Sequence, residues 1–407
     1  MKLKKILYLT YDGLTDPLGQ SQILPYLKGL AGYGYNFTIL SFEKKAKFNK
    51  GKELIKKLTA ESSIEWVALP FSERPPLISK FYDAIQMKKK AEALHLKNKY
   101  DMIHCRSYIA ADVGLYLKKK YGVKFFFDMR GFWADEKKDG SWNVSNPFYK
   151  LVYNYYKKRE TLFLKNADQV VILTHAGKNE MMSWDSVEKN TPVAVIPCCA
   201  DINHFTLTSL AQKIHGRNLL GIDPESLLVS YLGSIGTWYM LDEMIDLFAR
   251  IKIKYTGAKF LILTHSSIPM IYERVAAKNL SIEDFIIKEA SRNEVPIFIK
   301  ASDINISFIK PLYSKISSSP TKLAEVLSMG IPVIVNNGVG DVKEIVTEAR
   351  AGFVLENFDA KSLDEAVETI PDLMQLDSLK IRESVTKTYS LTNGIISYLA
   401  CYKNLIS

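Results

Sequence analysis

The 407-residue sequence has only four cysteines, and none of its apolar runs approaches the ~20 residues that a membrane-spanning helix needs. Cys198 and Cys199 are adjacent and the other two are widely separated, a pattern that does not suggest a disulfide framework. The apolar run at the start, MKLKKILYLTYDG, is too short for a signal peptide. These absences favour a cytoplasmic protein with free thiols over a secreted or membrane-spanning one.

Several signatures of catalysis or binding are also missing. The six histidines are dispersed, and no group of His, Cys, Asp or Glu has the spacing of metal ligands. The nucleophile elbow of serine hydrolases is absent, and no nucleic-acid-binding motif accompanies the basic residues. We therefore expect no bound metal, no cofactor and no nucleic-acid partner.

Charge is unevenly distributed along the chain. Residues 1–200 hold 33 lysines and arginines against 20 aspartates and glutamates, whereas the remainder holds 21 against 24. Lysines cluster at 44–52, 88–90 and 118–120. Such clusters are either solvated helix faces or sites that attract anionic lipid headgroups or a phosphate-bearing acceptor. The second interpretation would place the protein peripherally at the inner face of the cell membrane.

Short β-rich apolar runs alternate with longer helical patterns throughout, which predicts an α/β fold with parallel sheets covered by helices on both faces. The predicted strands of the first half are 4–10, 35–42, 64–69, 101–106, 124–129, 169–174 and 193–197, and those of the second are 227–233, 259–264, 285–290, 304–309, 332–336 and 352–355. We expect domains at 1–200 and 201–388, with a polar linker near 199–222. An amphipathic helix at 389–407 either completes the second domain or crosses back to the first.

Two glycine-containing loops follow predicted strands, where parallel sheets bind ligands. YDGLTDPLGQSQ places Gly19 and Gln20 at a helix start, but its spacing is not that of a dinucleotide-binding motif. An ordinary turn explains this loop about as well. YLGSIGTWYMLDEM holds Gly233 and Gly236 before a helix, where backbone N–H groups can face a diphosphate. A capped helix with a glycine turn is the alternative there.

The stretch ISSSPTKLAEVLSMGIPVIVNNG is the most informative one. Pro320 suits the first turn of a helix on which Lys322 and Glu325 project from one side. An exposed salt-bridged pair is the simplest interpretation of these two residues. The strand that directly follows the helix instead favours a cation and a carboxylate beside a phosphate-binding helix start.

The chain resembles the glycosyltransferases of family 4, which have the GT-B architecture of two Rossmann-like domains with parallel sheets facing across a cleft. The similarity extends over nearly the whole chain, through DPLGQSQILPYLKGLA, FDMRGFW, KNADQVVILT, VIPCCADINHF, YLGSIGTWYMLDEM and SPTKLAEVLSMGIPVI. The resemblance implies transfer with retention of the anomeric configuration, without a bound metal, from a nucleotide-sugar donor.

The resemblance also implies roles for single residues. Glu325 matches the family glutamate that accepts hydrogen bonds from the ribose hydroxyls. The preceding family glutamate falls on Ser317, and the usual arginine and lysine that hold the diphosphate are absent. Lys322 and the amides of the second glycine loop are the expected substitutes. The expected donor-binding residues are Gly19, Gln20, Gly233, Ser234, Gly236, Thr237, Ser319, Pro320, Thr321, Lys322 and Glu325.

The central segment FDMRGFWADEKKDGSW follows a predicted strand and supplies the expected acceptor side. We expect Asp128 and Arg130 to act in catalysis together with Lys322. Arg130 or Arg106 would also add positive charge near the diphosphate. The other expected acceptor-side residues are His104, Arg106, Trp133, Asp135 and Glu136. The alternatives are a core histidine for His104 and solvated carboxylates for Asp135 and Glu136.

The sequence therefore predicts a retaining transferase that moves a sugar from a UDP- or GDP-sugar to a glycan or a polyprenyl-linked glycan in polysaccharide synthesis. Its catalysis would be mainly electrostatic and positional. Two alternatives remain open at this stage. One is a sugar-nucleotide epimerase of the same fold, and the other is a degenerate protein that binds a nucleotide sugar or glycan without turnover.

Overall fold

The structure is a computed structural model that describes residues 3–75 and 78–406. The chain forms two compact units, the first made of Met1–Pro197 and Leu391–Ser407 and the second of Cys198–Ser390. The chain therefore passes from one unit to the other twice, after Pro197 and after Ser390.

The first unit contains a seven-stranded sheet in the order β3-β2-β1-β4-β5-β6-β7, with every recorded strand pair parallel. This order reverses between β1 and β4, as in Rossmann-like folds. All seven predicted strands are confirmed to within a few residues at their ends. Their bounds are β1 (Lys4–Thr10), β2 (Tyr35–Glu43), β3 (Glu65–Pro70), β4 (Met102–Arg106), β5 (Lys124–Asp128), β6 (Gln169–Ile172) and β7 (Val193–Val195).

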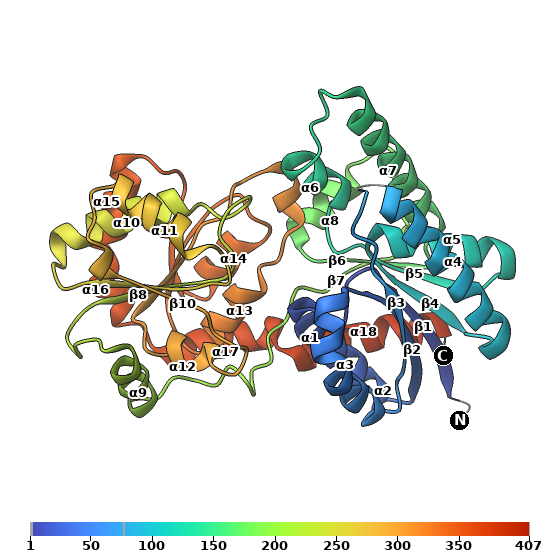
Figure 1. Ribbon diagram of the computed structural model, residues 1–407, viewed down its shortest axis with the longest axis horizontal. Coiled ribbons are helices and arrows are strands. Elements are labelled where there is room, and N and C mark those ends of the chain that lie inside the picture. The colour runs from blue at the N-terminus through green and yellow to red at the C-terminus, as the bar shows by residue number, and fades with distance from the viewer. Residues whose placement is uncertain (1–2, 76–77, 407) are drawn as a thin grey trace. The chain divides into compact units, whose positions relative to one another are not determined.

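Helices cover both faces of this sheet. Figure 1 shows α4, α5 and α7 over one face and α2, α3 and α18 over the other. Helix α5 packs against both α4 and α7. The helices of the unit are α1 (Pro17–Gln22), α2 (Leu24–Ala31), α3 (Lys45–Ala60), α4 (Ile78–Asn98), α5 (Ser107–Tyr121), α6 (Trp133–Gly140), α7 (Pro147–Asn166), α8 (His175–Met182) and α18 (Leu391–Ile406).

The C-terminal helix α18 packs against α2 in the first unit, so that the two ends of the chain belong to one unit (Figure 1). A Cβ atom on Gly29 of α2 would lie 2.3 Å from Cδ1 of Ile395, so the close approach of the two helices requires glycine at this position. Tyr398 and Tyr402 of α18 pack edge-on against Tyr26 and Tyr35 respectively.

The second unit contains a six-stranded parallel sheet in the order β10-β9-β8-β11-β12-β13. Both faces of the sheet are buried. Along β9, Phe260 and Ile262 join one hydrophobic cluster whereas Leu261 and Leu263 join another. The six predicted strands are confirmed, with the bounds β8 (Leu228–Leu232), β9 (Lys259–Leu263), β10 (Phe285–Lys288), β11 (Ile304–Ser307), β12 (Val333–Asn336) and β13 (Gly352–Leu355).

The helices of the second unit pack on the two clusters. Helices α10 and α15 supply residues to the first cluster, and α13 and α17 supply residues to the second. The elements are α9 (Leu210–Leu220), α10 (Leu241–Lys254), α11 (Ile268–Ala277), α12 (Val295–Ile299), α13 (Thr321–Ser328), α14 (Val342–Glu348), α15 (Ala360–Glu368), α16 (Ile370–Met374) and α17 (Ser378–Tyr389), with 3-10 turns η1 (Ile282–Asp284) and η2 (Tyr313–Ser317).

The prediction of a linker over 199–222 is wrong for most of that stretch. Helix α9 begins there with a capping box formed by Ser209 and Gln212. Arg217 of α9 is buried and donates hydrogen bonds to Asp303 and to backbone carbonyls of the second unit. The stretch appears polar because α9 buries few of its side chains and anchors itself largely through this charged residue.

Candidate functional site

Helix α13 presents Lys322 and Glu325 on one side while its apolar residues face the core of the second unit. Pro320 is the N-cap residue of this helix, and helical structure starts at Thr321. The predicted helix start is therefore confirmed to within one residue. The polar side of α13 faces the carboxyl end of β8, from which Tyr231 projects toward Lys322.

Lys322 is enclosed by aromatic rings. Its Nζ donates a hydrogen bond of 2.9 Å to the hydroxyl of Tyr231. The same atom lies 4.3 Å from the ring centre of Tyr231 and 3.7 Å from that of Tyr239. Burial holds the pKa of Lys322 well below its usual value, against the opposing effect of Glu325. An anion bound beside Lys322 would stabilise its charged form and oppose this lowering of its pKa.

Glu325 is the complementary group. Burial raises the pKa of its carboxyl to about 7, although Arg292 and Lys322 act in the opposite direction. Nη1 of Arg292, in the loop between β10 and α12, lies 3.8 Å from Oε1 of Glu325. A half-buried carboxylate next to one cation is suited to accept hydrogen bonds from two neighbouring hydroxyls.

The glycine loop that follows β8 lies directly beside Lys322. Gly233 has a φ of +133°, and a Cβ atom there would lie 2.9 Å from Nζ of Lys322. Gly236 and Thr237 also have positive φ angles, of 93° and 50°. Within residues 3–75 and 78–406, the amides of Ser234 and Thr237 have no hydrogen-bond acceptor, so both can donate to a ligand.

The helix predicted after this loop is confirmed, although it begins a few residues beyond Thr237. Helix α10 begins only at Leu241, and its first turn carries Asp242 and Glu243. These carboxylates disfavour an anion at the start of α10. The start of α13, which has no acidic residue in its first turn, remains the better phosphate site.

A cavity of about 220 Å³ opens at the carboxyl ends of β8 and β9. Its lining joins the glycine loop to the loop that carries Arg292, because Ala290 and Val295 flank that arginine in sequence. The lining residues are Leu232, Gly233, Ser234, Leu263, Thr264, His265, Ser266, Ala290 and Val295. The cavity is therefore adjacent to the donors of the loop and to the residue that contacts Glu325.

The hydroxyls that precede α13 are not all available. Ser317 is fully buried and its Oγ donates to the carbonyl of Ser314, and Oγ of Ser319 accepts the amide of Cys198. Lys315, which the sequence reasoning missed, is buried and lies 4.0 Å from the ring centre of Trp238 in the glycine loop. Arg292 was also missed, although each residue follows a predicted strand by only a few positions.

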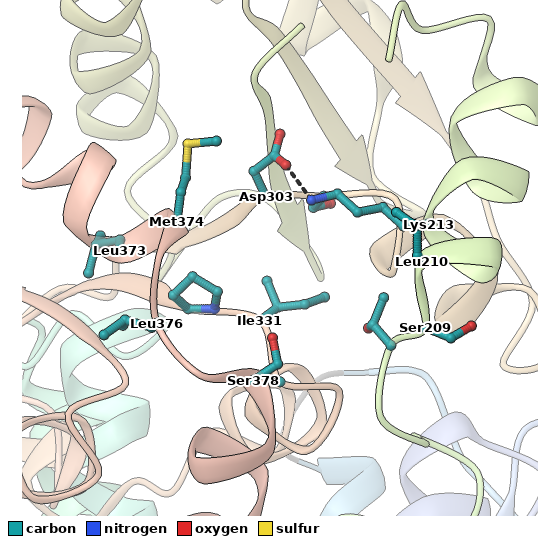
Figure 2. Close-up of a pocket in the computed structure, with 13 residues that line it drawn as sticks. Ser209, Leu210, Lys213, Asp303, Ile331, Leu373, Met374, Leu376 and Ser378 are labelled. Carbon is teal, nitrogen blue, oxygen red and sulfur yellow. Dashed lines mark hydrogen bonds and ion pairs between the residues drawn. The ribbon is translucent and has the colours of Figure 1, made fainter. Parts of the chain in front are cut away.

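A second cavity of about 150 Å³ lies at the amino edge of the same sheet, before β11 and β12. Figure 2 shows Lys213 reaching toward Asp303, with Ser209 and Leu210 nearby and Leu373, Met374 and Leu376 across the space. Asp303 accepts hydrogen bonds from Lys213 and Arg217. The only charged residues in the recorded lining of this cavity are Lys213 and Asp303, whose charges neutralise each other, so the lining offers no net charge to a diphosphate.

In the first unit, a polar cluster forms at the carboxyl edge of the sheet. Arg106 of β4 and Asp128 of β5 are paired in register, and His104 lies two residues before Arg106. Oδ2 of Asp128 accepts a hydrogen bond of 2.9 Å from Tyr398 and lies 3.5 Å from Nε2 of His104. The hydroxyl of Tyr402 lies 2.6 Å from Nδ1 of His104. Helix α18 thus supplies two partners to this cluster.

Electrostatics keep Asp128 ionised in this buried position. Burial raises the pKa of its carboxyl, but Arg130 and His104 outweigh that effect and hold it below its usual value. Burial lowers the pKa of His104 and favours its neutral form. Oδ1 of Asp128 and Nη1 of Arg106 are buried and have no hydrogen-bond partner among the described residues. Ser107 and Arg130 adopt positive φ angles of 65° and 56° at these strand ends.

The remaining predicted acceptor-side residues lie on α6. Asp135 is buried, and its carboxylate accepts hydrogen bonds from Tyr153 and Lys157. Trp133 packs edge-on against Trp142 and Tyr156. Glu136 lies in the first turn of the helix. These contacts explain how α6 is held on α7, and the acceptor-side roles of the three residues stay predictions.

Gly19 and Gln20 lie on α1 in the first unit. A Cβ atom on Gly19 would lie 2.2 Å from the carbonyl oxygen of Gly13, so glycine is required by the packing of this loop. Nε2 of Gln20 donates to the carbonyl of Thr15. Glu43 at the end of β2 accepts the amides of Leu14 and Thr15, which gives it a structural role in the loop.

Two family models match the chain in succession. Residues 23–204 match the model described as Glycosyltransferase Family 4, and residues 215–379 match the model described as Glycosyl transferases group 1. No curated protein sequence matches the chain.

Solved structures share the fold across almost the whole chain. Sucrose-phosphate synthase from Thermosynechococcus elongatus is 16% identical with a TM-score of 0.76, covering 99% of both chains. Anabaena HepE, in complex with UDP and glucose, is 13% identical with a TM-score of 0.71, covering 98% of this chain and 100% of its own. WaaG, a glycosyltransferase involved in lipopolysaccharide biosynthesis, is 14% identical with a TM-score of 0.69 and 98% coverage of both chains.

The two family models lie on the two units in turn, and the order of strands in each unit is the Rossmann-like one that the resemblance implied. The chain belongs to the family 4 glycosyltransferases of GT-B fold.

Proposed function

We propose that the protein transfers a sugar, with retention of the anomeric configuration, from a UDP- or GDP-sugar to a glycan or lipid-linked glycan in polysaccharide synthesis. The observation that carries this proposal is the half-buried pair of Lys322 and Glu325 beside the glycine loop of the second unit. An amine and a carboxyl that are largely removed from water, without a close ion pair between them, are costly to fold. A ligand that brings both phosphate and ribose hydroxyls offsets that cost.

The donor diphosphate would bind at Nζ of Lys322 and at the start of α13. The free amides of Ser234 and Thr237 are suited to donate to the same phosphates. The ribose hydroxyls would donate to the carboxylate of Glu325. The cavity beside the glycine loop then has space for the base, and HepE, which holds UDP and glucose, has the same fold.

Catalysis would consist mainly of stabilising the departing diphosphate. Lys322 sits in an apolar, aromatic surrounding, where its charge acts more strongly than in water. In a front-face retaining reaction the donor phosphate itself accepts the proton of the acceptor hydroxyl. The proposal therefore needs no metal and no dedicated protein base, and it gives Asp128 and Arg130 the task of positioning the acceptor.

Incubation with UDP- and GDP-sugars tests this proposal. Slow release of free nucleotide and sugar, with faster release when a glycan acceptor is added, supports the transferase. Formation of an epimerised nucleotide sugar would instead show an epimerase, and binding without turnover would show a non-catalytic binding protein. Thermal shift with each nucleotide identifies the donor beforehand, because a ligand that binds only the folded protein raises its melting temperature.

A further inference from the structure

Helix α4 exposes an apolar face that no other described element covers. Ile78, Phe81, Tyr82 and Ile85 recur at helical spacing and are exposed, Ile78 to 65%. The opposite face of the same helix is buried and includes Asp83, Met87 and Ala91. The exposed face of the helix is therefore apolar in this part of α4, whereas the exposed face of a helix in water is normally polar.

Helix α7 has a matching face. Phe148, Leu151 and Tyr155 are spaced at i, i+3 and i+7 and are exposed, Leu151 to 68%. The ring of Tyr155 lies 6.3 Å from that of Phe81 on α4, centre to centre. Figure 1 shows both helices on the same side of the first sheet. The contact between Phe81 and Tyr155 joins the two rows of exposed side chains, and we call these seven residues the α4/α7 face.

Lysines border this surface toward the C-terminal parts of both helices. Lys89 and Lys90 of α4 and Lys158 of α7 are exposed and have no carboxylate partner in the described part of the chain. The acidic residues of these helix segments are bound to other groups. Asp83 is buried and accepts a hydrogen bond from the hydroxyl of Tyr11, and Glu160 is buried against Lys157. Glu92 of α4 is partly buried and paired with Lys120, and it also accepts hydrogen bonds from two tyrosine hydroxyls.

The topology places the apolar part of this face at the functional edge of the sheet. Helix α4 ends at Asn98 shortly before β4, and α7 ends at Asn166 shortly before β6, so both end at the amino edge. Their first turns therefore lie toward the carboxyl edge, where Asp128 ends β5 and Arg130 follows. An acceptor held in a bilayer at the α4/α7 face would be close to these residues.

We propose that the α4/α7 face binds the surface of an anionic phospholipid bilayer, with its aromatic and aliphatic side chains in the headgroup region and its lysines on the lipid phosphates. Helices with an apolar outer face and flanking lysines lie in the plane of such an interface. The first 200 residues carry a net charge of +13, which adds a long-range attraction. The inference rests on the proposed function only for the lipid-linked acceptor. Among the described residues, no helix is long and apolar enough to span a membrane.

Co-sedimentation of the full chain with vesicles tests the proposal. We expect binding to phosphatidylcholine vesicles that contain phosphatidylglycerol, weaker binding to pure phosphatidylcholine, and release by salt. The double variant Lys89→Glu/Lys90→Glu should bind at least roughly 30-fold more weakly, since each lysine near an anionic surface strengthens binding about fivefold. Leu151→Ser and Ile85→Ser should also weaken binding. The controls Lys361→Glu and Ile253→Ser, which change exposed residues of the second unit, should leave it unchanged.

Equal binding by the control and test variants would overturn the proposal. Wild-type protein that binds vesicles equally well with and without phosphatidylglycerol would also overturn it. Sedimentation velocity without lipid would overturn it by showing a dimer that Leu151→Ser dissociates, because the face would then bind a second copy. Release of nucleotide from the donor, assayed without vesicles, separates the two proposals. If every variant and the wild type bind vesicles as expected but none turns over a donor, the proposed function fails while the α4/α7 face stands.

Discussion

Replacing Glu325 by glutamine should separate what this carboxyl costs the fold from what it gives to donor binding. Burial raises its pKa from 4.5 to about 7. At about 1.4 kcal/mol for each pH unit, this difference corresponds to about 3 kcal/mol of folding free energy. Glutamine has nearly the same shape and carries no charge. Glu325→Gln should therefore stabilise the second unit while it impairs the site.

The sign of the pH dependence follows from proton binding. Between pH 4.5 and about 7 the folded protein holds a proton on Glu325 that the unfolded chain has released. Stability therefore falls as the pH rises through this window, and the full cost is present above it. The stability gained by Glu325→Gln should grow from about 1 kcal/mol at roughly pH 5 to about 3 kcal/mol at roughly pH 8.

Differential scanning calorimetry at the two pH values measures this gain. For a unit of this size, about 3 kcal/mol corresponds to roughly 6–12 °C in Tm. Isothermal titration of the wild type and the variant with UDP and GDP measures the functional loss, which we expect to be about 10–100-fold in Kd for one lost hydrogen bond to a charged acceptor. A variant whose stability differs from wild type by the same amount at both pH values would refute the electrostatic reasoning. Unchanged nucleotide affinity would refute the ribose site.

Three further variants test other parts of the site. Gly233→Ala places a Cβ atom 2.9 Å from Nζ of Lys322 and should weaken nucleotide binding at least about tenfold by calorimetry, whereas Gly257→Ala, where the nearest atom is 3.5 Å away, should not. Tyr398→Phe removes the hydrogen bond to Asp128 and should lower kcat more than donor affinity, with a loss of about 1.5–3 kcal/mol in stability; an unchanged kcat would exclude a positioning role. Asp303→Asn weakens the buried pair with Arg217 and should lower the Tm, but it should leave the nucleotide Kd unchanged if the second cavity is not the donor site.

Most strands were predictable because they are short, largely apolar and buried on both faces, whereas strands at the sheet edges, such as β3 and β10, are only partly buried. Runs such as KFLIL send alternate side chains into two cores, so that every position after the first is apolar and the run stands out from the amphipathic helices around it. Helix α9 was missed for the opposite reason, since it buries few residues and relies on Arg217. Periodicity detects elements that are held by apolar packing and overlooks one that is held by a buried charge.

The helix that carries Lys322 and Glu325 could likewise be predicted, because Pro320 suits its first turn. The spacing of the two residues then places them on one side of it. Their surroundings could not be predicted, because Tyr231, Tyr239 and Arg292 come from the ends of other strands and meet α13 only in the folded unit. Sequence spacing shows that two side chains share one side of a helix. It does not show whether that side is exposed to solvent or buried, and here burial is the main cause of both pKa shifts.

The chain departs from the family pattern at Ser317 and in the glycine loop, and the structure shows what surrounds these positions. Ser317 is fully buried and satisfied by a backbone carbonyl, so this position brings no carboxylate to a bound sugar. Lys315 lies over Trp238 and Arg292 lies beside Glu325, and we propose that they add to Lys322 and the loop amides in place of the arginine and lysine missing from the glycine loop. Positive charge thus reaches the site from η2 and from the β10–α12 loop instead of from the β8 loop. A bound diphosphate is attracted by the electrostatic potential at its own position, whichever loop carries the cation. We therefore infer that the site keeps its preference for an anion although the glycine loop lacks the arginine and the lysine.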